Sequence, residues 1–329
     1  MSHALVLGAT GHIGAHVVRA LLARGHAVRA AYRAEPRLHV LEDLPVERVR
    51  VDLNEPASLR AAADGCEWIF HAAGYYPRAR AKRQEAVKQG IESTQRILGV
   101  LRDLAVSRIV FTSSAATIQR IPGRSTDERD AEPWPLDSWR SLYATVKIAM
   151  EQEVLRAAHG GLPIVIVNPT VCLGEYDAHQ FSGLSILLYA KYRFSFYVQH
   201  SFDAVYTGDV GMGHVLAAER GRLGERYLLT GQEITVQEFA RKVTSLAGVR
   251  TPLVRMPMGL AYVAAGINEL AASLSGIEPL LSRQALAWLR LGCSLNGTKA
   301  RQELGMPSTS LDEAIRRAIT WFRQHRYLK

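Results

Sequence analysis

The sequence lacks the signatures of several protein classes. Its three cysteines form no CxxC pair and no metal-ligand spacing, which predicts free thiols in a reducing compartment and no metal site. A membrane-spanning helix needs about 18 consecutive uncharged apolar residues, and no segment approaches that length. The N-terminus lacks the basic segment and cleavage site of a signal peptide. We therefore expect a cytoplasmic protein with no membrane span.

Nucleic-acid-binding motifs are also absent, although the chain is basic. Its 40 Lys and Arg residues against 31 Asp and Glu give a formal net charge of +9. The basic residues are scattered along predicted helices, without zinc-finger spacing or an aromatic RNA-binding signature. We expect no nucleic-acid partner. The one dense basic cluster, residues 78–83, fits a solvated loop or the binding of an anionic substrate tail.

The first half of the chain alternates between two hydrophobic patterns. Short apolar runs predict strands, and apolar residues at helical spacing predict the helices between them. The predicted strands are 4–7, 27–32, 46–53, 68–70, 109–112 and 163–167, and the predicted helices are 13–22, 57–63, 85–104 and 141–159. This alternation predicts an α/β fold with a doubly wound parallel sheet, a Rossmann fold.

A glycine-rich turn, GATGHIG at residues 8–14, joins the first strand to the first helix. The first glycine permits the tight turn, the second lets the backbone approach a pyrophosphate, and the third allows close packing of helix and strand. Backbone N–H groups at the helix start face the anion. We favour a dinucleotide site over a purely structural turn. The residues predicted to contact the cofactor here are Gly8, Thr10, Gly11, His12 and Ile13.

The second strand indicates which dinucleotide binds. It ends at Tyr32-Arg33, with no carboxylate before Glu35. An arginine pairs with a 2′-phosphate, whereas an acidic residue holds a ribose hydroxyl. This favours NADP(H), with NAD(H) as the alternative cofactor and an exposed surface arginine as the alternative role for Arg33. Residues after the third and fourth strands complete the predicted cofactor site: Asp52 and Leu53 at the adenine, and Ala72, Ala73 and Gly74 at the ribose and nicotinamide.

Tyr143 and Lys147 stand four residues apart, on one face of the predicted helix 141–159. A neighbouring cation favours the phenolate, so the pair can give a proton to a carbonyl oxygen or take one from an alcohol. Ser113 and Ser114 follow the fifth strand, where ligands of open parallel sheets bind. A hydroxyl there can orient the substrate oxygen.

The chain resembles the extended short-chain dehydrogenase/reductase superfamily, of the NAD-dependent epimerase/dehydratase type. The resemblance is strongest to the dihydroflavonol-4-reductase-like branch and to bacterial hopanoid-associated sugar epimerases. The motifs that carry it are GATGHIG (8–14), VDL (51–53), HAAG (71–74), FTSSA (111–115), YATVK (143–147) and NPTVCLG (168–174).

The resemblance implies roles for individual residues. Tyr143 would be the acid/base and Lys147 its cationic partner, also holding the nicotinamide ribose. Ser114 would orient the substrate oxygen, with Ser113 as the alternative. Thr112, Pro169 and Val171 would contribute to the nicotinamide side of the cofactor site. Gly90 departs from the family pattern, because it replaces an asparagine that supports a water-linked proton path.

The pattern becomes irregular after residue 168, with helices predicted at 210–220, 236–246, 259–273, 283–291 and 311–324. We expect an NADP-binding Rossmann domain over 1–170 and a smaller, mostly helical substrate-binding part over 171–329. The chain is expected to cross back into the sheet near 203–220. The resemblance also allows a homodimer built from the helices 85–104 and 141–159.

These observations predict an NADP(H)-dependent reductase that converts a ketone or aldehyde to the alcohol, with Tyr143 as proton donor. The aromatic-rich segment 189–202 suits a small apolar or aromatic substrate, unless these rings pack internally. Tyr75 and Tyr76 are expected in the same pocket, with Ser114. One alternative is an NAD-dependent sugar-nucleotide epimerase/dehydratase, although the arginine and tyrosine usual after the sixth strand are missing. The other is a non-catalytic dinucleotide-sensing protein.

Overall fold

A computed structural model of the chain describes residues 2–33, 35–77, 81–121, 123–130, 141–178, 182–192, 195–275, 283, 286 and 294–328. Most of the predicted helix 283–291 and two members of the basic cluster, Arg78 and Arg80, lie outside the described residues. So does Phe194 of the aromatic-rich segment.

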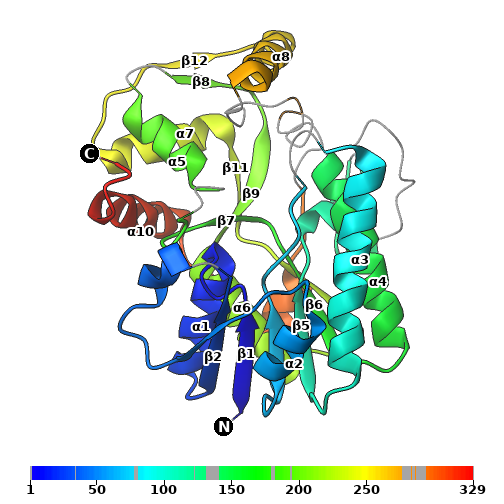
Figure 1. The fold of residues 1–329 in the computed structure, drawn as a ribbon. Helices are drawn as coiled ribbons and strands as arrows, with labels where there is room; N and C mark the ends of the chain where they lie inside the picture. Colours follow the sequence, from blue (N-terminus) through cyan, green and yellow to red (C-terminus); the bar gives the residue numbers. More distant parts are fainter. Residues whose placement is uncertain are drawn as a thin grey trace.

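A seven-stranded parallel sheet forms the centre of the molecule (Figure 1). Its strands follow the order β10-β6-β5-β4-β1-β2-β3, which confirms the predicted doubly wound Rossmann fold. The strands are β1 (His3–Leu7), β2 (Ala27–Tyr32), β3 (Glu47–Arg50), β4 (Trp68–His71), β5 (Arg108–Thr112), β6 (Ile164–Pro169) and β10 (Arg226–Leu229).

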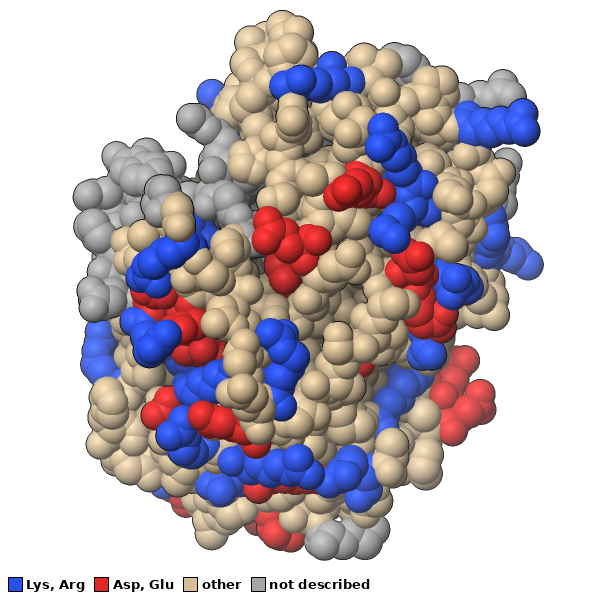
Figure 2. Space-filling view, turned by 180° about the vertical axis from the view of Figure 1, so that it is seen from behind, with Lys and Arg blue, Asp and Glu red and all other residues tan. Residues whose placement is uncertain are grey.

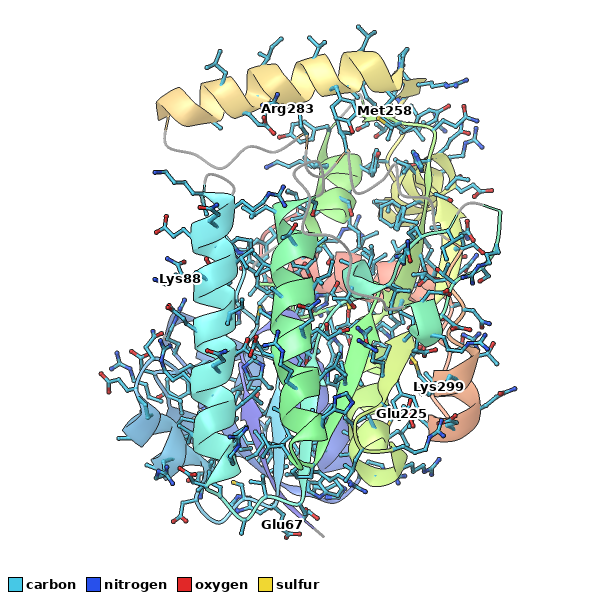
Figure 3. The ribbon with its side chains drawn as sticks, turned by 90° about the vertical axis from the view of Figure 1, so that its right-hand side faces the viewer. Glu67, Lys88, Glu225, Met258, Arg283 and Lys299 are labelled. Atoms are coloured by element: carbon cyan, nitrogen blue, oxygen red, sulfur yellow. The ribbon has the colours of Figure 1, made fainter. Side chains whose placement is uncertain are left out.

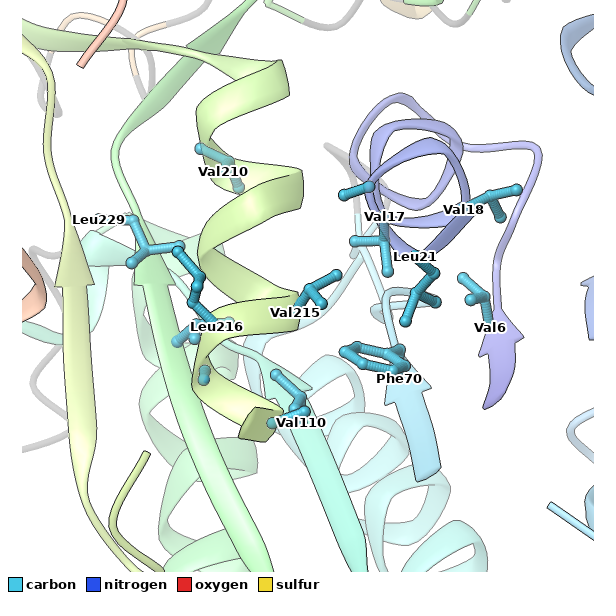
Figure 4. Close-up of a cluster of buried hydrophobic side chains, with 14 of the residues drawn as sticks. Val6, Val17, Val18, Leu21, Phe70, Val110, Val210, Val215, Leu216 and Leu229 are labelled. Atoms are coloured by element: carbon cyan, nitrogen blue, oxygen red, sulfur yellow. The ribbon is translucent and has the colours of Figure 1, made fainter. Parts of the chain in front are cut away.

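Helices cover both faces of this sheet, which is why its central strands are almost entirely apolar. Side chains of α1 and α6 pack on one face, where Val17, Leu21 and Val215 surround Phe70 and Val110 (Figure 4). Side chains of α2, α3 and α4 pack on the other face. The helices are α1 (His12–Ala23), α2 (Pro56–Ala63), α3 (Arg83–Arg102), α4 (Leu142–His159) and α6 (Thr207–Arg220).

The second part of the chain contributes to the sheet and also builds a smaller lobe. Helix α6 and strand β10 belong to the Rossmann body, whereas the smaller lobe lies beyond the carboxyl ends of the sheet strands (Figure 1). Its own core joins α5, α7 and α10 to short strands. The elements are β7 (Val171–Leu173), α5 (Leu184–Lys191), β8 (Ser195–Tyr197), β9 (Ser201–Tyr206), β11 (Gln232–Thr235), α7 (Val236–Ala247), β12 (Leu253–Arg255), α8 (Met258–Ser275) and α10 (Leu311–Gln324).

The main difference from the sequence prediction is the set of strands after residue 170. The segments β7 to β12 have three to six residues each, too short for a clear alternating pattern. Strand β10 joins the central sheet by pairing with β6, and β11 forms a strand by pairing with β9. Among the described residues, no helix combines the length and the apolar character needed to cross a bilayer.

Candidate active site

The glycine turn between β1 and α1 leaves room for an anion. Gly8 has a φ of 83°, a conformation that side chains disfavour, and a Cβ on Gly14 would lie 2.1 Å from the Gly8 carbonyl oxygen. Gly11 is the N-cap of α1, and within this fully described helix no side chain caps the first turn and no acidic residue occupies it. Its first N–H groups are therefore suited to hold an anion. The turn fits the pyrophosphate of a dinucleotide.

Tyr143 and Lys147 lie on the first two turns of α4. The helix begins after Ser141, whose hydroxyl accepts a hydrogen bond from the Ala144 N–H at 3.1 Å. The Lys147 ammonium lies 5.8 Å from the centre of the Tyr143 ring and is buried. A Cβ on Gly74 would lie 2.7 Å from Lys147 Nζ, so the glycine after β4 gives the ammonium its space. Sequence spacing and tertiary packing thus bring these three residues together.

Burial controls the protonation of this pair. It lowers the pKa of Lys147 to about 8, and the nearby Glu151 carboxylate opposes that shift. Burial also raises the pKa of Tyr143, although hydrogen bonding with Ser114 and Tyr76 opposes this. The sequence predicted that a cation would favour the phenolate. In the structure the larger effect of burial wins, so the phenol is protonated at neutral pH and able to donate.

The two serines after β5 point to different partners. Ser114 interacts with the Tyr143 phenol, and its Oγ also accepts from the Ala116 N–H at 3.1 Å. Ser113 donates a short hydrogen bond to the Glu151 carboxylate instead. Of the two candidates for orienting a substrate oxygen, only Ser114 therefore meets Tyr143. The Thr112 hydroxyl, predicted at the cofactor, pairs with the buried His214 ring at 2.8 Å.

A buried polar network behind the serines was missed at the sequence level. Glu151 Oε2 accepts from Thr117 Oγ1 at 3.0 Å and from Asn168 Nδ2 at 2.7 Å, while Glu151 Oε1 accepts from Arg226 Nε at 2.8 Å. Asn168 also donates to the backbone carbonyl of Ser114 at 3.2 Å. The network fixes the turn that carries Ser114. One signal was available, because Glu151 continues the spacing of four from Tyr143 and Lys147 on one helix face.

Two arginines stand at the predicted adenosine end. Arg33 directly follows β2 and is exposed, without a hydrogen bond or ion pair to any residue that the structure describes. Arg50 ends β3 and is also exposed; it lies in register with Tyr32, the residue before Arg33. Arg50 is a second basic candidate that the sequence pattern did not indicate. Asp52 is exposed nearby, and its carboxylate accepts from the Asn54 N–H at 2.9 Å.

His12, at the start of α1, connects the glycine turn to the second part of the chain. Its Nε2 lies 2.9 Å from Thr207 Oγ1 on α6, and its Nδ1 lies 4.0 Å from a carboxylate oxygen of Asp177. Burial lowers the pKa of His12, and the Asp177 charge opposes the shift. The ring is thus neutral at neutral pH. The other predicted cofactor residues are buried or half-buried: Thr10, Ile13, Leu53, Ala72, Ala73, Pro169 and Val171.

The aromatic residues predicted at the substrate divide into two groups. The Tyr76 ring stacks on the Tyr143 ring, with centres 5.6 Å apart, and is 49% exposed. Tyr75 instead directs its hydroxyl to Gln89 on α3 at 2.7 Å. In the aromatic-rich segment, Tyr189 and Phe202 pack edge-on against a buried ring of the smaller lobe, so internal packing accounts for them.

Gly90 brings α3 close to α4. A Cβ at this position would lie 2.9 Å from a methyl group of Val146 and 3.2 Å from Met150 Cγ. The asparagine expected from the family pattern would therefore require Val146 and Met150 to shift.

Comparison with known proteins gives consistent results. The model described as the NAD dependent epimerase/dehydratase family matches residues 4–229. A Synechocystis sp. protein whose name refers to dihydroflavonol 4-reductase is 31% identical, over 98% of this chain and 95% of its own length. A Stigmatella aurantiaca protein named 4-hydroxy-2-methyl-3-oxo-4-farnesyl-3,4-dihydroquinoline-1-oxide ketoreductase is 30% identical, over 91% of this chain and 90% of its own. A crystal structure titled as a nucleoside-diphosphate-sugar epimerase from Pseudomonas aeruginosa is 30% identical, with a TM-score of 0.84 over 100% of this chain and 99% of that chain.

Proposed function

We propose that this chain, which belongs to the NAD dependent epimerase/dehydratase family of extended short-chain dehydrogenases/reductases, is an NADP(H)-dependent carbonyl reductase. The observation that carries the proposal is the protonated Tyr143 phenol, in contact with Ser114 and beside the buried ammonium of Lys147. All three lie near the carboxyl ends of the sheet strands, the edge at which the glycine turn also opens. A reductase needs a proton donor and an oxygen-orienting group at that edge.

The residues of this chain would act on the carbonyl oxygen. The glycine turn and Lys147 would hold NADPH, which supplies the hydride when bound. Ser114 and Tyr143 would both hydrogen-bond the carbonyl oxygen and fix its orientation. Tyr143 would give its proton to that oxygen as the alcohol forms. Lys147, cationic below pH 8, would stabilise the negative charge left on the phenolate.

The proposed substrate is a small apolar or aromatic ketone or aldehyde. The Tyr76 ring, half-exposed and stacked on Tyr143, offers an apolar surface directly at the proposed proton donor. The Stigmatella relative is named for reduction of a ketone that carries a farnesyl group. Both features favour an apolar ketone over a hydrated sugar nucleotide.

Epimerisation of a sugar nucleotide is the second candidate, because the similar Pseudomonas structure carries that title. An epimerase retains its NAD between turnovers, whereas a reductase consumes NADPH. A non-catalytic sensor is less favoured, since such proteins do not need an intact Tyr143 and Lys147 pair. Release of oxidised cofactor in step with ketone consumption would distinguish the reductase from both.

The test of the proposed chemistry is Tyr143→Phe. It should lower kcat for NADPH-dependent ketone reduction by roughly 10²–10⁴-fold, because the proton donor is lost, while NADPH still binds. Tyr327→Phe, which removes the hydroxyl of a partly buried ring that packs against the core of the smaller lobe, is the matched control and should keep wild-type kcat. If a broad ketone panel gives no Tyr143-dependent NADPH oxidation, the reductase proposal fails.

The test of the cofactor preference is Arg33→Ala. Loss of a charged hydrogen bond to the 2′-phosphate should raise the Kd for NADPH by roughly 10–100-fold and leave the Kd for NADH nearly unchanged. Arg102→Ala, at the exposed end of α3, should change neither. Equal effects on the two cofactors would assign Arg33 to the protein surface and move the proposal to Arg50.

A further inference from the structure

Helix α8 buries its small side chains and exposes its large aliphatic ones, the reverse of an ordinary surface helix. Its buried side chains are small, with Ala261 1% and Ala265 0% exposed. Its large aliphatic side chains face outward, with Leu260 61%, Val263 60% and Ile267 65% exposed. Figure 3 shows side chains along the side of α8 that faces away from the body. The helix therefore offers an apolar face to its surroundings.

This arrangement does not suit contact with water. Burying one Leu, Val or Ile side chain is worth roughly 1.5–3 kcal/mol, so an aqueous surface helix normally turns such residues inward. Scattered exposed aliphatic residues are ordinary, but here they recur at 260, 263, 267 and 270, which is one face of a helix. A contiguous apolar face of this kind marks a contact with an apolar phase or partner.

The apolar surface continues on the strand pair before α8. Strand β12 ends three residues before the helix begins and pairs with β8, with Val254 opposite Phe196. These two side chains are 40% and 49% exposed. Strands and helix lie together at one end of the molecule (Figure 1).

Among the described residues, the charges around this face are basic apart from one paired carboxylate. The described stretches 182–192, 195–200 and 246–268 contain no Asp or Glu, but they carry the exposed cations Lys191, Arg250 and Arg255. The carboxylate of α8, Glu269, is 2.7 Å from the guanidinium of Arg283. In Figure 2 the uppermost part of the molecule is tan and blue without red.

We propose that α8 docks on the surface of an anionic lipid bilayer. The helix would lie in the plane of the interface with its apolar face among the acyl chains, while Lys191, Arg250 and Arg255 contact the headgroups. A two-fold dimer through this face would bring like charges together, and the one carboxylate described on α8, Glu269, is already paired with Arg283, which favours the bilayer over a second copy.

The docking surface lies beyond the same sheet edge at which α4, the helix that carries Tyr143, begins (Figure 1). A docked protein would thus hold this edge of the sheet, at which the proposed active site lies, toward the membrane. An apolar ketone dissolved in the bilayer could enter the site without crossing water. This last step rests on the proposed function, whereas docking itself does not.

Co-sedimentation with vesicles tests the docking. The wild-type protein should bind vesicles of phosphatidylcholine with phosphatidylglycerol, more weakly at high salt and more weakly to phosphatidylcholine alone. The double variant Val263→Gln, Ile267→Gln should bind at least about tenfold more weakly to both. Leu223→Gln, at an apolar side chain 52% exposed between α6 and β10, is the matched control and should bind like the wild type.

The charges are tested separately. Arg250→Gln should weaken binding to the anionic vesicles by roughly fivefold and have little effect on neutral ones. Arg102→Gln, at the other end of the molecule, should change neither. All substituted side chains are exposed, so the variants should keep the wild-type Tm.

Three results would overturn the proposal. The first is a wild-type protein that does not bind anionic vesicles, and the second is a double variant that binds them as tightly as the wild type. The third is a wild-type dimer in solution that the double variant converts to a monomer, which would assign the face to a second copy. Vesicle binding is measured without cofactor or substrate, and reduction can be measured on a water-soluble ketone. Failure of docking and failure of the reductase proposal are therefore separate outcomes.

Discussion

Lys147 shows how one residue serves the site at a cost to the fold. Its ammonium is buried, with only 2% of the residue exposed, and lies 5.0 Å from the centre of the Tyr76 ring. Glu151 is one helical turn away, but its carboxylate is already shared among Ser113, Thr117, Asn168 and Arg226. Burial of the cation is therefore only partly compensated, and its pKa falls to about 8.

Replacing this cation should stabilise the protein. A shift from 10.5 to about 8 corresponds to about 3 kcal/mol, so Lys147→Met should raise the free energy of unfolding at pH 7 by roughly 1–3 kcal/mol while activity is lost. The gain should be complete below pH 8 and decline steadily between pH 8 and 10.5, because over that range the wild type releases a proton on folding, and this release costs less as the pH rises. Urea denaturation at several pH values measures it. A less stable variant at pH 7 would show that the packing of Lys147 outweighs its desolvation.

At the scale of elements, the approach of α3 to α4 decides how the site helix is held. Gly90 allows the close contact, and Arg83 of α3 donates to Thr145 Oγ1 of α4 at 2.5 Å. Further along, Gln95 donates to Glu153 at 2.9 Å. These contacts flank Tyr143 and Lys147 on α4. The position of the proposed acid thus depends on a helix pair that is closely packed at residue 90.

Restoring the family residue at this position should therefore be harmful. Gly90→Asn should lower the free energy of unfolding by roughly 1–3 kcal/mol, because the new side chain meets Val146 and Met150. Gly99→Asn is the matched control on the same helix, since an added Cβ there meets nothing within 4 Å. Urea denaturation of both variants separates packing from helix propensity. Equal stabilities would mean that α3 moves away without cost.

At the scale of the whole molecule, the two parts of the chain share one sheet and one buried charge network. Strand β10 pairs with β6, and its first residue, Arg226, reaches Glu151 on α4. Leu228 of the same strand donates its N–H to the buried Glu128 carboxylate at 2.7 Å. Residues far apart in the chain thus stabilise the turn that carries Ser114.

Removing the ion pair between Arg226 and Glu151 should lower the stability of the whole fold. Arg226→Gln should lower the free energy of unfolding by roughly 3 kcal/mol, because it leaves the buried Glu151 charge without its guanidinium. Arg222→Gln, whose ion pair with Glu303 lies at the surface, should cost about 1 kcal/mol or less. Thermal and urea unfolding of the two variants give the comparison. If both lose the same stability, Glu151 relies on its other hydrogen bonds alone.

The sequence by itself determined the features that depend on local spacing. The alternation of apolar runs and helical patterns predicted the parallel sheet, and helix 141–159 was predicted within one residue of α4 (Leu142–His159). The glycine turn and the Tyr143 and Lys147 pair could be read because each lies within one short segment. In these cases the backbone geometry of a strand, turn or helix already sets the relative positions.

Only the tertiary structure decided which distant residues complete the site and which face remains outside. The joining of Glu151 to Asn168 and Arg226, the stacking of Tyr76 on Tyr143 and the pairing of β10 with β6 all connect segments that share no local pattern. The sequence also does not show that the aliphatic side chains of α8 face outward, because helical spacing indicates that an apolar face exists but not whether it packs against the core. That choice depends on how the finished elements pack, since the largest gain comes from burial summed over the whole molecule.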